Sequence, residues 1–279
     1  MGRLELLYVW YGWTVGTFLL FAGGEVPHRW LWTLGHFLVI FPAYGLSRLR
    51  FGPLKIALLL GCLLLAFNSL GQILPDLVPF PGEILVMAWD EALGAQAVRA
   101  FLRQPPVWVV EVCTLCYSSF YFLPIFLIII LYRKGRSDRV YHFAFRILGG
   151  FLFSYMGYIA MPTLPPYRFI DFGGALQGGV FYEALDPLLK QYEGLKQDCM
   201  PSGHTMMTLL TLHFAAKYAR RHLLWLAPVG FFLILGTLVL RLHWVVDLVV
   251  GALFALVAIP LFPEVPRSSL SPGDGREGS

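Results

Sequence analysis

The hydrophobic residues of this chain are gathered into long runs that are separated by polar segments. Eight of these runs approach the roughly 20 residues that a helix needs to cross the hydrocarbon core of a bilayer. They cover residues 4–22, 30–46, 54–71, 107–132, 146–161, 203–218, 223–240 and 243–262. The pattern predicts an all-α fold, a polytopic transmembrane bundle of about eight helices that forms a single integral membrane domain over residues 1–262.

The segments outside these runs differ in composition. Residues 72–106 are rich in proline and contain a mildly amphipathic stretch at 83–103, which we expect to lie along the membrane interface. Residues 162–202 are rich in Pro, Gly, Tyr and acidic side chains, and the loop 168–198 within them either covers a site or forms an idle flexible connection. Residues 263–279 are polar and rich in Gly and Ser, which predicts a disordered cytoplasmic tail.

The composition restricts the class of protein. The 279 residues are 57% hydrophobic and only 14% charged, with a mean hydropathy of +0.66. Such a chain is too apolar for an ordinary soluble domain, and its net charge of +4 is better explained by loops that face the cytoplasm than by a nucleic-acid partner. With both termini cytoplasmic, two thirds of the 21 Lys and Arg residues lie inside. The starts of the sixth and eighth runs then face outward together with residues 162–202.

Cysteine is sparse and gives no sign of a metal site. Three of the four cysteines lie in apolar runs and Cys199 lies in a connection, so no disulfide framework is predicted. Cys113 and Cys116 have the spacing of a redox or metal pair, but no second pair accompanies them, and helix packing is the favoured interpretation. The sequence has no histidine pair or acidic cluster with metal-ligand spacing. We therefore expect neither a metal nor another cofactor.

Two polar clusters carry the candidate chemistry, and the first opens the predicted helix 203–218. Ser202, Gly203 and His204 follow Pro201 at its start. The free amides and the dipole of a helix N-terminus favour a bound anion, to which Ser202 adds a hydroxyl donor and Gly203 allows close approach. His204 is then placed to donate a proton to a departing alkoxide. A plain helix start with a surface histidine is the simpler alternative for this cluster alone.

The second cluster opens the last apolar run. His243 and Asp247 are four residues apart and share one face of a helix, so the carboxylate can orient one ring nitrogen and leave the other free to attack. An ionisable residue within a span is a functional candidate, because burying an unpaired charge in hydrocarbon is costly. The alternative is a pair that only stabilises the helix end. Both clusters lie on the same predicted membrane face, which strengthens each of them.

The two clusters together resemble a known family. Pro-Ser-Gly-His at 201–204, followed by His-x-x-x-Asp at 243–247, resembles the second and third signature motifs of the type 2 phosphatidic acid phosphatase superfamily. The resemblance extends over about residues 146–262. It implies a six-helix catalytic core, a metal-independent mechanism and a histidine that becomes phosphorylated.

The resemblance also assigns roles by position. It implies that His243 is the nucleophile, that Asp247 orients it, and that His204 protonates the leaving group. Ser202 and Gly203 are implied to help bind the phosphate.

The cationic residues of the family pattern are incomplete here. Arg168 is the best match to the first motif, but Met161 stands where that motif has Lys and Phe169 where it has Pro. In the third motif, Thr237 stands where an Arg is usual, and Arg241 is the nearby cation. Arg168 and Arg241 are therefore the candidate phosphate ligands, with loop solvation and interfacial snorkelling as their alternatives.

Two further segments resemble one branch of the superfamily. Residues 162–167 (Pro-Thr-Leu-Pro-Pro-Tyr) and 117–124 are similar to the branch of inositol phosphorylceramide and sphingomyelin synthases. This implies a membrane phospholipid as donor and a lipid alcohol as acceptor, whereas the phosphatase branch transfers the group to water.

Two other interpretations remain open. A lipid or solute transporter can also place ionisable residues inside its bundle, although the chain has no clear internal repeat and its polar residues gather near one face. A catalytically inactive family member retained as a scaffold is disfavoured because all three catalytic positions are filled.

Overall fold

The computed structural model describes residues 1–22, 25–77, 82–193 and 197–264, and every regular element in these residues is a helix. The helices are α1 (Arg3–Phe21), α2 (Arg29–Leu38), α3 (Ile40–Ser47), α4 (Pro53–Leu77), α5 (Gly82–Ala92), α6 (Ala95–Phe101), α7 (Val107–Ser118), α8 (Phe122–Arg133), α9 (Ser137–Ala160), η1 (Pro166–Arg168), α10 (Val180–Glu193), α11 (Gly203–Tyr218), η2 (Arg220–His222), α12 (Leu223–Val239) and α13 (Val245–Leu261). The predicted all-α membrane bundle is confirmed.

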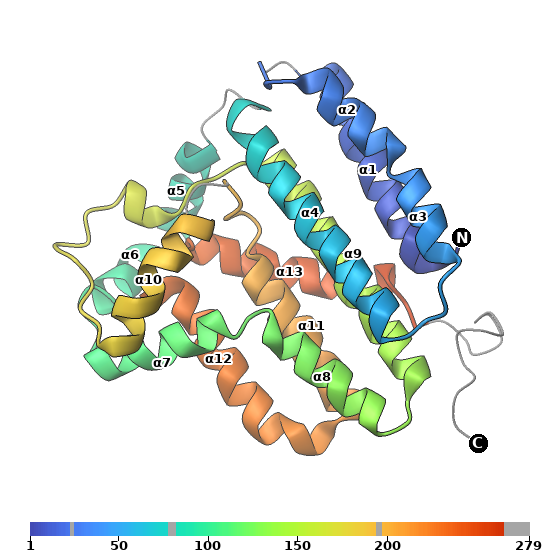
Figure 1. Ribbon diagram of the computed structural model, residues 1–279. Coiled ribbons are helices and arrows are strands. Elements are labelled where there is room, and N and C mark those ends of the chain that lie inside the picture. The colour runs from blue at the N-terminus through green and yellow to red at the C-terminus, as the bar shows by residue number, and fades with distance from the viewer. Residues whose placement is uncertain (23–24, 78–81, 194–196, 265–279) are drawn as a thin grey trace.

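The bundle is built around α9. In Figure 1, α1 to α4 lie on one side, α7, α8 and α12 on the other, and α9, α11 and α13 between them. α9 contacts α1, α4, α8, α11 and α13, and most of its residues are buried. Large side chains such as Phe143, Leu152 and Phe214 fill this centre. The helices α11 and α13, which carry candidate site residues, therefore both pack against the most buried helix of the bundle.

Several predicted spans have different limits in the structure. The run 107–132 is two helices, α7 and α8, bent by 57° at residues 119–121. Ser118 and Ser119 donate their hydroxyls to the carbonyls of Thr114 and Cys116, which competes with the helical ladder at the bend. The run 30–46 is interrupted at Val39 between α2 and α3.

Other helices start earlier or end later than their apolar runs. α9 begins at Ser137 and not at residue 146, and Arg139 in its first turn donates to the carboxylate of Glu264 at 3.1 Å. α4 continues to Leu77 through Pro75, which was expected in the following connection.

Fewer helices pass a strict test of length and hydropathy than the eight predicted runs. Among the described residues, α1, α4, α9 and the segment Arg220–Val239 are long and apolar enough to cross a membrane, and α7 with α8 would make a fifth span. α11 and α13 have 16 and 17 residues, about 25 Å of helix, which is shorter than the hydrocarbon core. Both helices pack against other helices, α11 against α9 and α12, and α13 against α5 and α9. They are therefore enclosed by protein over part of their length.

The two long connections contain helices that pack on α13 and on α7. Residues 72–106 hold α5 and α6, and α5 packs on α13. Residues 162–202 hold η1 and α10, and the carboxylate of Glu111 on α7 accepts hydrogen bonds from three backbone amides at the start of α10. Most of the predicted disordered tail, residues 265–279, lies outside the described residues, but Glu264 is placed and contacts Arg139 and Lys217.

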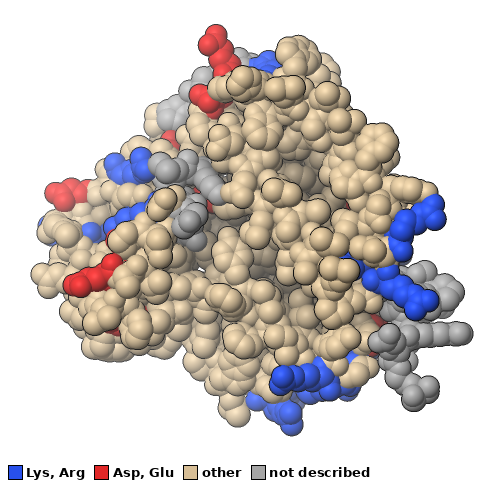
Figure 2. Space-filling view, in the orientation of Figure 1, with Lys and Arg blue, Asp and Glu red and all other residues tan. Residues whose placement is uncertain are grey.

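Charged side chains are unevenly distributed over the visible face. Figure 2 shows groups of Lys and Arg along the lower and right edges, whereas the prominent Asp and Glu groups lie toward the left and top, where Lys and Arg are also visible. In Figure 1 the connection between α8 and α9 lies at the lower right and the N-terminus at the right, while α5, α6 and α10 lie at the left.

Candidate active site

The start of α11 is held in place by backbone contacts with α13. Ser202 is the N-cap residue, and its Oγ accepts from the amide of Thr205 at 3.2 Å. The amide of Ser202 donates to the carbonyl of Asp247 at 3.0 Å, which ties the two sequence clusters together. A Cβ on Gly203 would lie 2.5 Å from Tyr158 Oη, so glycine is needed at this close approach.

The segment that leads into α11 is fixed by the preceding connection. Thr163 pairs with Asp198 in an isolated bridge, and the amide of Cys199 donates to the carbonyl of Thr163 at 3.2 Å. The Thr163 hydroxyl accepts from the amide of Met200 at 3.0 Å. The connection 162–202 is therefore not idle at its ends, because it sets the position of the first cluster.

His243 lies in the tight turn between α12 and α13. The carbonyl of Thr237 accepts from the amides of Leu242 and His243, each at 3.0 Å, and Arg241 adopts a left-handed conformation with a φ of 62°. The backbone of Thr237, which occupies the position of a usual family Arg, thus helps to shape the turn that presents His243.

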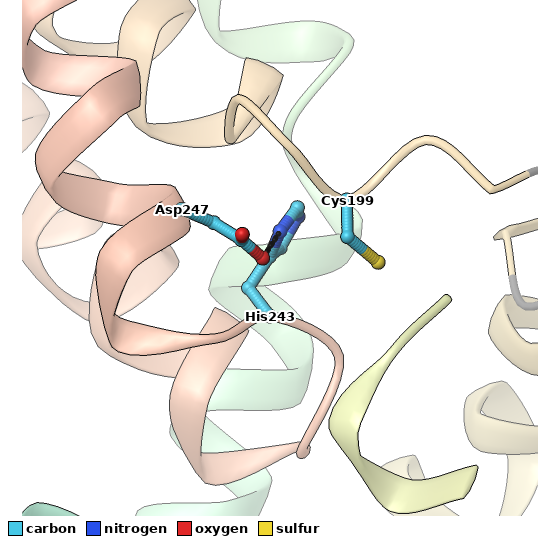
Figure 3. A group of neighbouring side chains, drawn as sticks. All are labelled: Cys199, His243 and Asp247. Atoms are coloured by element: carbon cyan, nitrogen blue, oxygen red, sulfur yellow. Dashed lines mark hydrogen bonds and ion pairs between the residues drawn. The ribbon is translucent and has the colours of Figure 1, made fainter. Parts of the chain in front are cut away.

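His204, His243 and Asp247 form a continuous chain of contacts (Figure 3 shows the latter two). His243 Nδ1 lies 3.2 Å from Asp247 Oδ2, and His243 Nε2 lies 3.3 Å from His204 Nδ1. Asp247 Oδ2 also accepts from the amide of Trp244 at 2.8 Å. With Nδ1–H donated to the carboxylate, the tautomer assigned to His243 has its lone pair on Nε2, the nitrogen that faces His204.

The two imidazoles border a small cavity that is lined mainly by aromatic rings. The cavity measures about 40 Å³, and His243 is only 6% exposed. His204 stacks on Tyr117 with ring centroids 4.5 Å apart and packs against Phe120 at 4.2 Å. Other lining residues include Tyr121, Tyr155, Tyr158 and Asp198. No Lys or Arg is among the described residues that line it.

The two predicted arginine ligands lie elsewhere. Arg168 is exposed in η1 and its guanidinium lies 5.8 Å from the ring of Tyr167, outside the cavity of the two imidazoles. Arg241 donates to the carbonyls of Gly174 at 2.9 Å and Arg103 at 3.0 Å.

Arg241 borders a second small cavity behind His243, and desolvation lowers its pKa. The structure therefore gives Arg241 a role in tying together two connections. The binding of phosphate by Arg168 or Arg241 stays a prediction.

One residue near the site was missed in the sequence. Asp90 on α5 is buried; its Oδ1 accepts from the amide of Val246 at 2.8 Å, and its Oδ2 lies 2.5 Å from Arg99 Nη1. Burial raises the pKa of Asp90, and the contacts with Val246 and Arg99 oppose that rise. The sequence signal for this ion pair was an acidic and a basic residue nine positions apart in the amphipathic stretch 83–103. The contact with Val246 could not be predicted in this way, because that residue lies 156 positions away.

Cys199, His243 and Asp247 present possible metal-ligand atoms that all lie within 4.8 Å of one another (Figure 3). Thiolate, imidazole and carboxylate are ligands that suit zinc. In this structure, however, Asp247 Oδ2 already accepts from Trp244, and the thiol of Cys199 donates to the carbonyl of Leu242 at 3.4 Å. Asp247 Oδ1 has no hydrogen-bond partner among the described residues, and the expectation of no metal remains to be tested.

The sequence matches one family model. The model of the PAP2 superfamily matches residues 85–261, which include most of α5, all the candidate site residues and α13. No curated protein and no solved structure gave a significant match.

Proposed function

This chain belongs to the PAP2 superfamily, and from that premise we propose that it transfers the phospho-headgroup of a membrane phospholipid to a lipid alcohol. Membership makes it a membrane enzyme of the phosphatase or phosphotransferase type. The observation that carries the proposal is the chain of contacts from His204 through His243 to Asp247 beside a cavity without Lys or Arg.

The first half-reaction forms a covalent intermediate. Nε2 of His243 attacks phosphorus, an N–P bond forms, and the P–O bond to the diacylglycerol breaks. The leaving alkoxide takes a proton from His204. Asp247 keeps the Nδ1 proton of His243 in place and stabilises the positive charge that develops on the ring. A substrate phosphorus atom between the two imidazoles would replace their direct contact of 3.3 Å.

The second half-reaction regenerates the histidine. The hydroxyl oxygen of a lipid alcohol attacks phosphorus, its proton passes to His204, and the N–P bond breaks. Ser202 and Gly203 at the start of α11 supply the helix N-terminus that we expect to hold the phosphate oxygens.

The low number of cations favours a phosphodiester substrate. A phosphomonoester carries close to two negative charges at neutral pH, whereas the phosphodiester of a phospholipid headgroup linkage carries one. The described cavity residues supply two histidines and a helix N-terminus but no Lys or Arg. This supports a headgroup transferase over the alternative, a lipid phosphate phosphatase that releases the group to water.

We place the site on the extracytoplasmic side of the membrane, with both termini in the cytoplasm. The basic segments after α3, between α8 and α9, and between α11 and α12 support this orientation, since cytoplasmic loops are enriched in Lys and Arg.

The test is a transfer assay with the purified full-length protein in phosphatidylcholine vesicles. A fluorescent phospholipid donor is supplied with and without ceramide or diacylglycerol, each in the presence of a chelator. We expect lipid product only with the alcohol and no loss on chelation. Product without an acceptor would select the phosphatase, and chelator-sensitive turnover would indicate metal chemistry.

The variants test the two histidines separately. His243→Ala should abolish turnover and remove the headgroup-phosphate adduct that mass spectrometry detects on residue 243. His204→Ala should slow turnover by roughly 10²- to 10⁴-fold, the usual range for loss of a general acid. His213→Ala, on the same helix as His204 but exposed, is the matched control and should retain activity. Full activity of His243→Ala would refute the proposed nucleophile.

A further inference from the structure

A second, larger cavity lies among the N-terminal helices, outside the region that matches the family model. It measures about 290 Å³ and is enclosed by α1, α2, α3 and α4. Its walls are mainly apolar, with Trp32, Val39, Leu46, Cys62 and Leu65 among them. No Asp, Glu, Lys or Arg is among the described residues that line it. The cavity therefore suits an uncharged, largely hydrocarbon ligand and disfavours a phosphate-bearing headgroup.

A small polar group interrupts this apolar wall. Tyr11 lines the cavity and is 3% exposed, and the Ser69 side chain is its polar neighbour. Ser69 donates its own hydroxyl to the carbonyl of Ala66 at 2.7 Å. His36 lies on the same wall, with its ring 6.3 Å from that of Tyr11. The Tyr11 hydroxyl can both donate and accept, so a ligand hydroxyl at this point can form a hydrogen bond with it.

One layer of side chains separates this cavity from the candidate active site. Tyr155 borders the catalytic cavity and contacts Tyr11 edge-on, with ring centroids 5.9 Å apart. Phe67 also borders the catalytic cavity and packs on Tyr155 at 5.6 Å, while its neighbour Ala66 borders the second cavity. A ligand held at Tyr11 is therefore next to the aromatic wall of the reaction site.

We infer that this cavity binds a neutral lipid alcohol, the acceptor substrate, with its hydrocarbon chain between α1, α3 and α4 and its hydroxyl at Tyr11. The inference rests on the proposed transfer reaction, since that reaction needs an alcohol distinct from the charged donor. It places selection of the acceptor in the N-terminal helices, whereas the donor is handled by α11 and α13. The hydrocarbon lining accepts the chain and the single polar spot recognises the hydroxyl.

The direct test is photolabelling of the full-length protein in phosphatidylcholine vesicles. The probes are diacylglycerol and ceramide with a diazirine in one chain, and an alkyl diazirine probe without a hydroxyl. We expect the two alcohols to label peptides of α1 and α4 and to be displaced by excess unlabelled alcohol. Equal labelling by the hydroxyl-free probe, or displacement by the phospholipid donor, would overturn the assignment.

Glycine 35 allows the cavity to be filled without disturbing the helices. Nothing lies within 4 Å of a Cβ built on Gly35, which lines the cavity, and Gly61 on α4 is equally open but does not line it. Gly35→Phe should reduce labelling and raise the KM for the alcohol about tenfold, while Gly61→Phe leaves both unchanged. Unchanged labelling and KM in Gly35→Phe would contradict the site.

A conservative variant tests the hydroxyl itself. Tyr11→Phe retains the ring and should weaken binding of the alcohol about fivefold, the usual effect of one lost hydrogen bond, without changing the KM for the donor. Equal binding by Tyr11→Phe would refute recognition by the hydroxyl. Labelling does not depend on turnover. Labelling without transfer would therefore contradict only the proposed reaction, and transfer without labelling would contradict only this binding site.

Discussion

The carboxylate of Asp247 determines which nitrogen of His243 carries the proton. It is fully buried, and Oδ2 accepts from both His243 Nδ1 and the amide of Trp244. An asparagine oxygen in the place of Oδ2 can accept both hydrogen bonds, but the neutral amide does not stabilise the positive charge that develops on His243 during its attack on phosphorus.

We therefore expect Asp247→Asn to retain the fold and to lower kcat by about 10³-fold, with little change in KM. Steady-state kinetics with the fluorescent donor measure the loss, and the melting temperature controls for folding. A kcat within threefold of the unsubstituted enzyme would mean that the negative charge of Asp247 is not needed for the attack.

At this scale the sequence predicted that His204, His243 and Asp247 lie together, but not their cationic surroundings. The His-x-x-x-Asp spacing predicted the contact of His243 with Asp247, but His243 lies in the turn before α13 and not on a shared helix face as expected. The predicted helix start gave the position of His204. The sequence cannot show that Arg241 donates to Gly174 and Arg103, because those carbonyls belong to connections whose path depends on long-range packing. A charged residue near a motif in sequence therefore need not point into the site.

At the scale of elements, α5 controls the start of α13. The helix N-terminus leaves free amides, and Asp90 of α5 accepts from that of Val246 while Arg99 of α6 balances its charge. Val246 is separated from His243 by two residues and precedes Asp247, so a shift of this turn moves both. The sequence predicted an interfacial amphipathic stretch here but not that it caps a catalytic helix.

Asp90→Ala should leave the free amide of Val246 without its partner and lower kcat by roughly tenfold through misplacement of His243. Asp90→Asn can keep one carbonyl oxygen on Val246 and should restore most of the activity. The KM for the donor should change less than kcat in both variants, a split that mere loss of folded protein would not produce. If Asp90→Ala and Asp90→Asn reduce the yield of folded protein equally and leave kcat unchanged, Asp90 has a structural role only.

At the scale of the whole molecule, Glu264 follows the end of α13 and contacts two other helices, α9 and α11. It accepts from Lys217 at 2.8 Å and from Arg139 at 3.1 Å, and it also contacts Tyr218. Partial burial would raise the pKa of Glu264, but the hydrogen bonds with Lys217 and Tyr218 and the nearby charges outweigh it, so the pKa is lowered. The folded state thus holds the ionised form more firmly than the unfolded chain does.

A carboxylate with a lowered pKa in the folded state adds stability above its unfolded pKa of about 4.3 and loses it as pH falls through the folded value. The melting temperature should therefore fall between pH 5 and pH 3, and Glu264→Gln should flatten that part of the profile. The effect is small because the partner Lys217 is about half exposed, and solvent screens its ion pair with Glu264. An identical slope in the variant would show that these contacts do not contribute to folding.

The arrangement of the whole bundle was only partly predictable. Apolar runs predicted where helices form, and all eight runs contain helix in the structure. An apolar run does not by itself identify a span, because the helix of run 203–218 also packs against α9, α12 and α13. Hydropathy alone cannot separate a helix that faces lipid from one enclosed by other helices.

The orientation of the bundle decides which leaflet supplies the substrate, and it can be tested without any enzyme assay. Lys134 in the basic connection between α8 and α9 and Gln177 before α10 are both exposed, and they lie on opposite sides of the proposed topology. A membrane-impermeant maleimide applied to intact cells should label Gln177→Cys and not Lys134→Cys, and permeabilisation should expose the latter. Because His204 and His243 border the same end as the start of α10, the reverse labelling would place the phosphate chemistry in the cytoplasmic leaflet while leaving the geometry of the site intact.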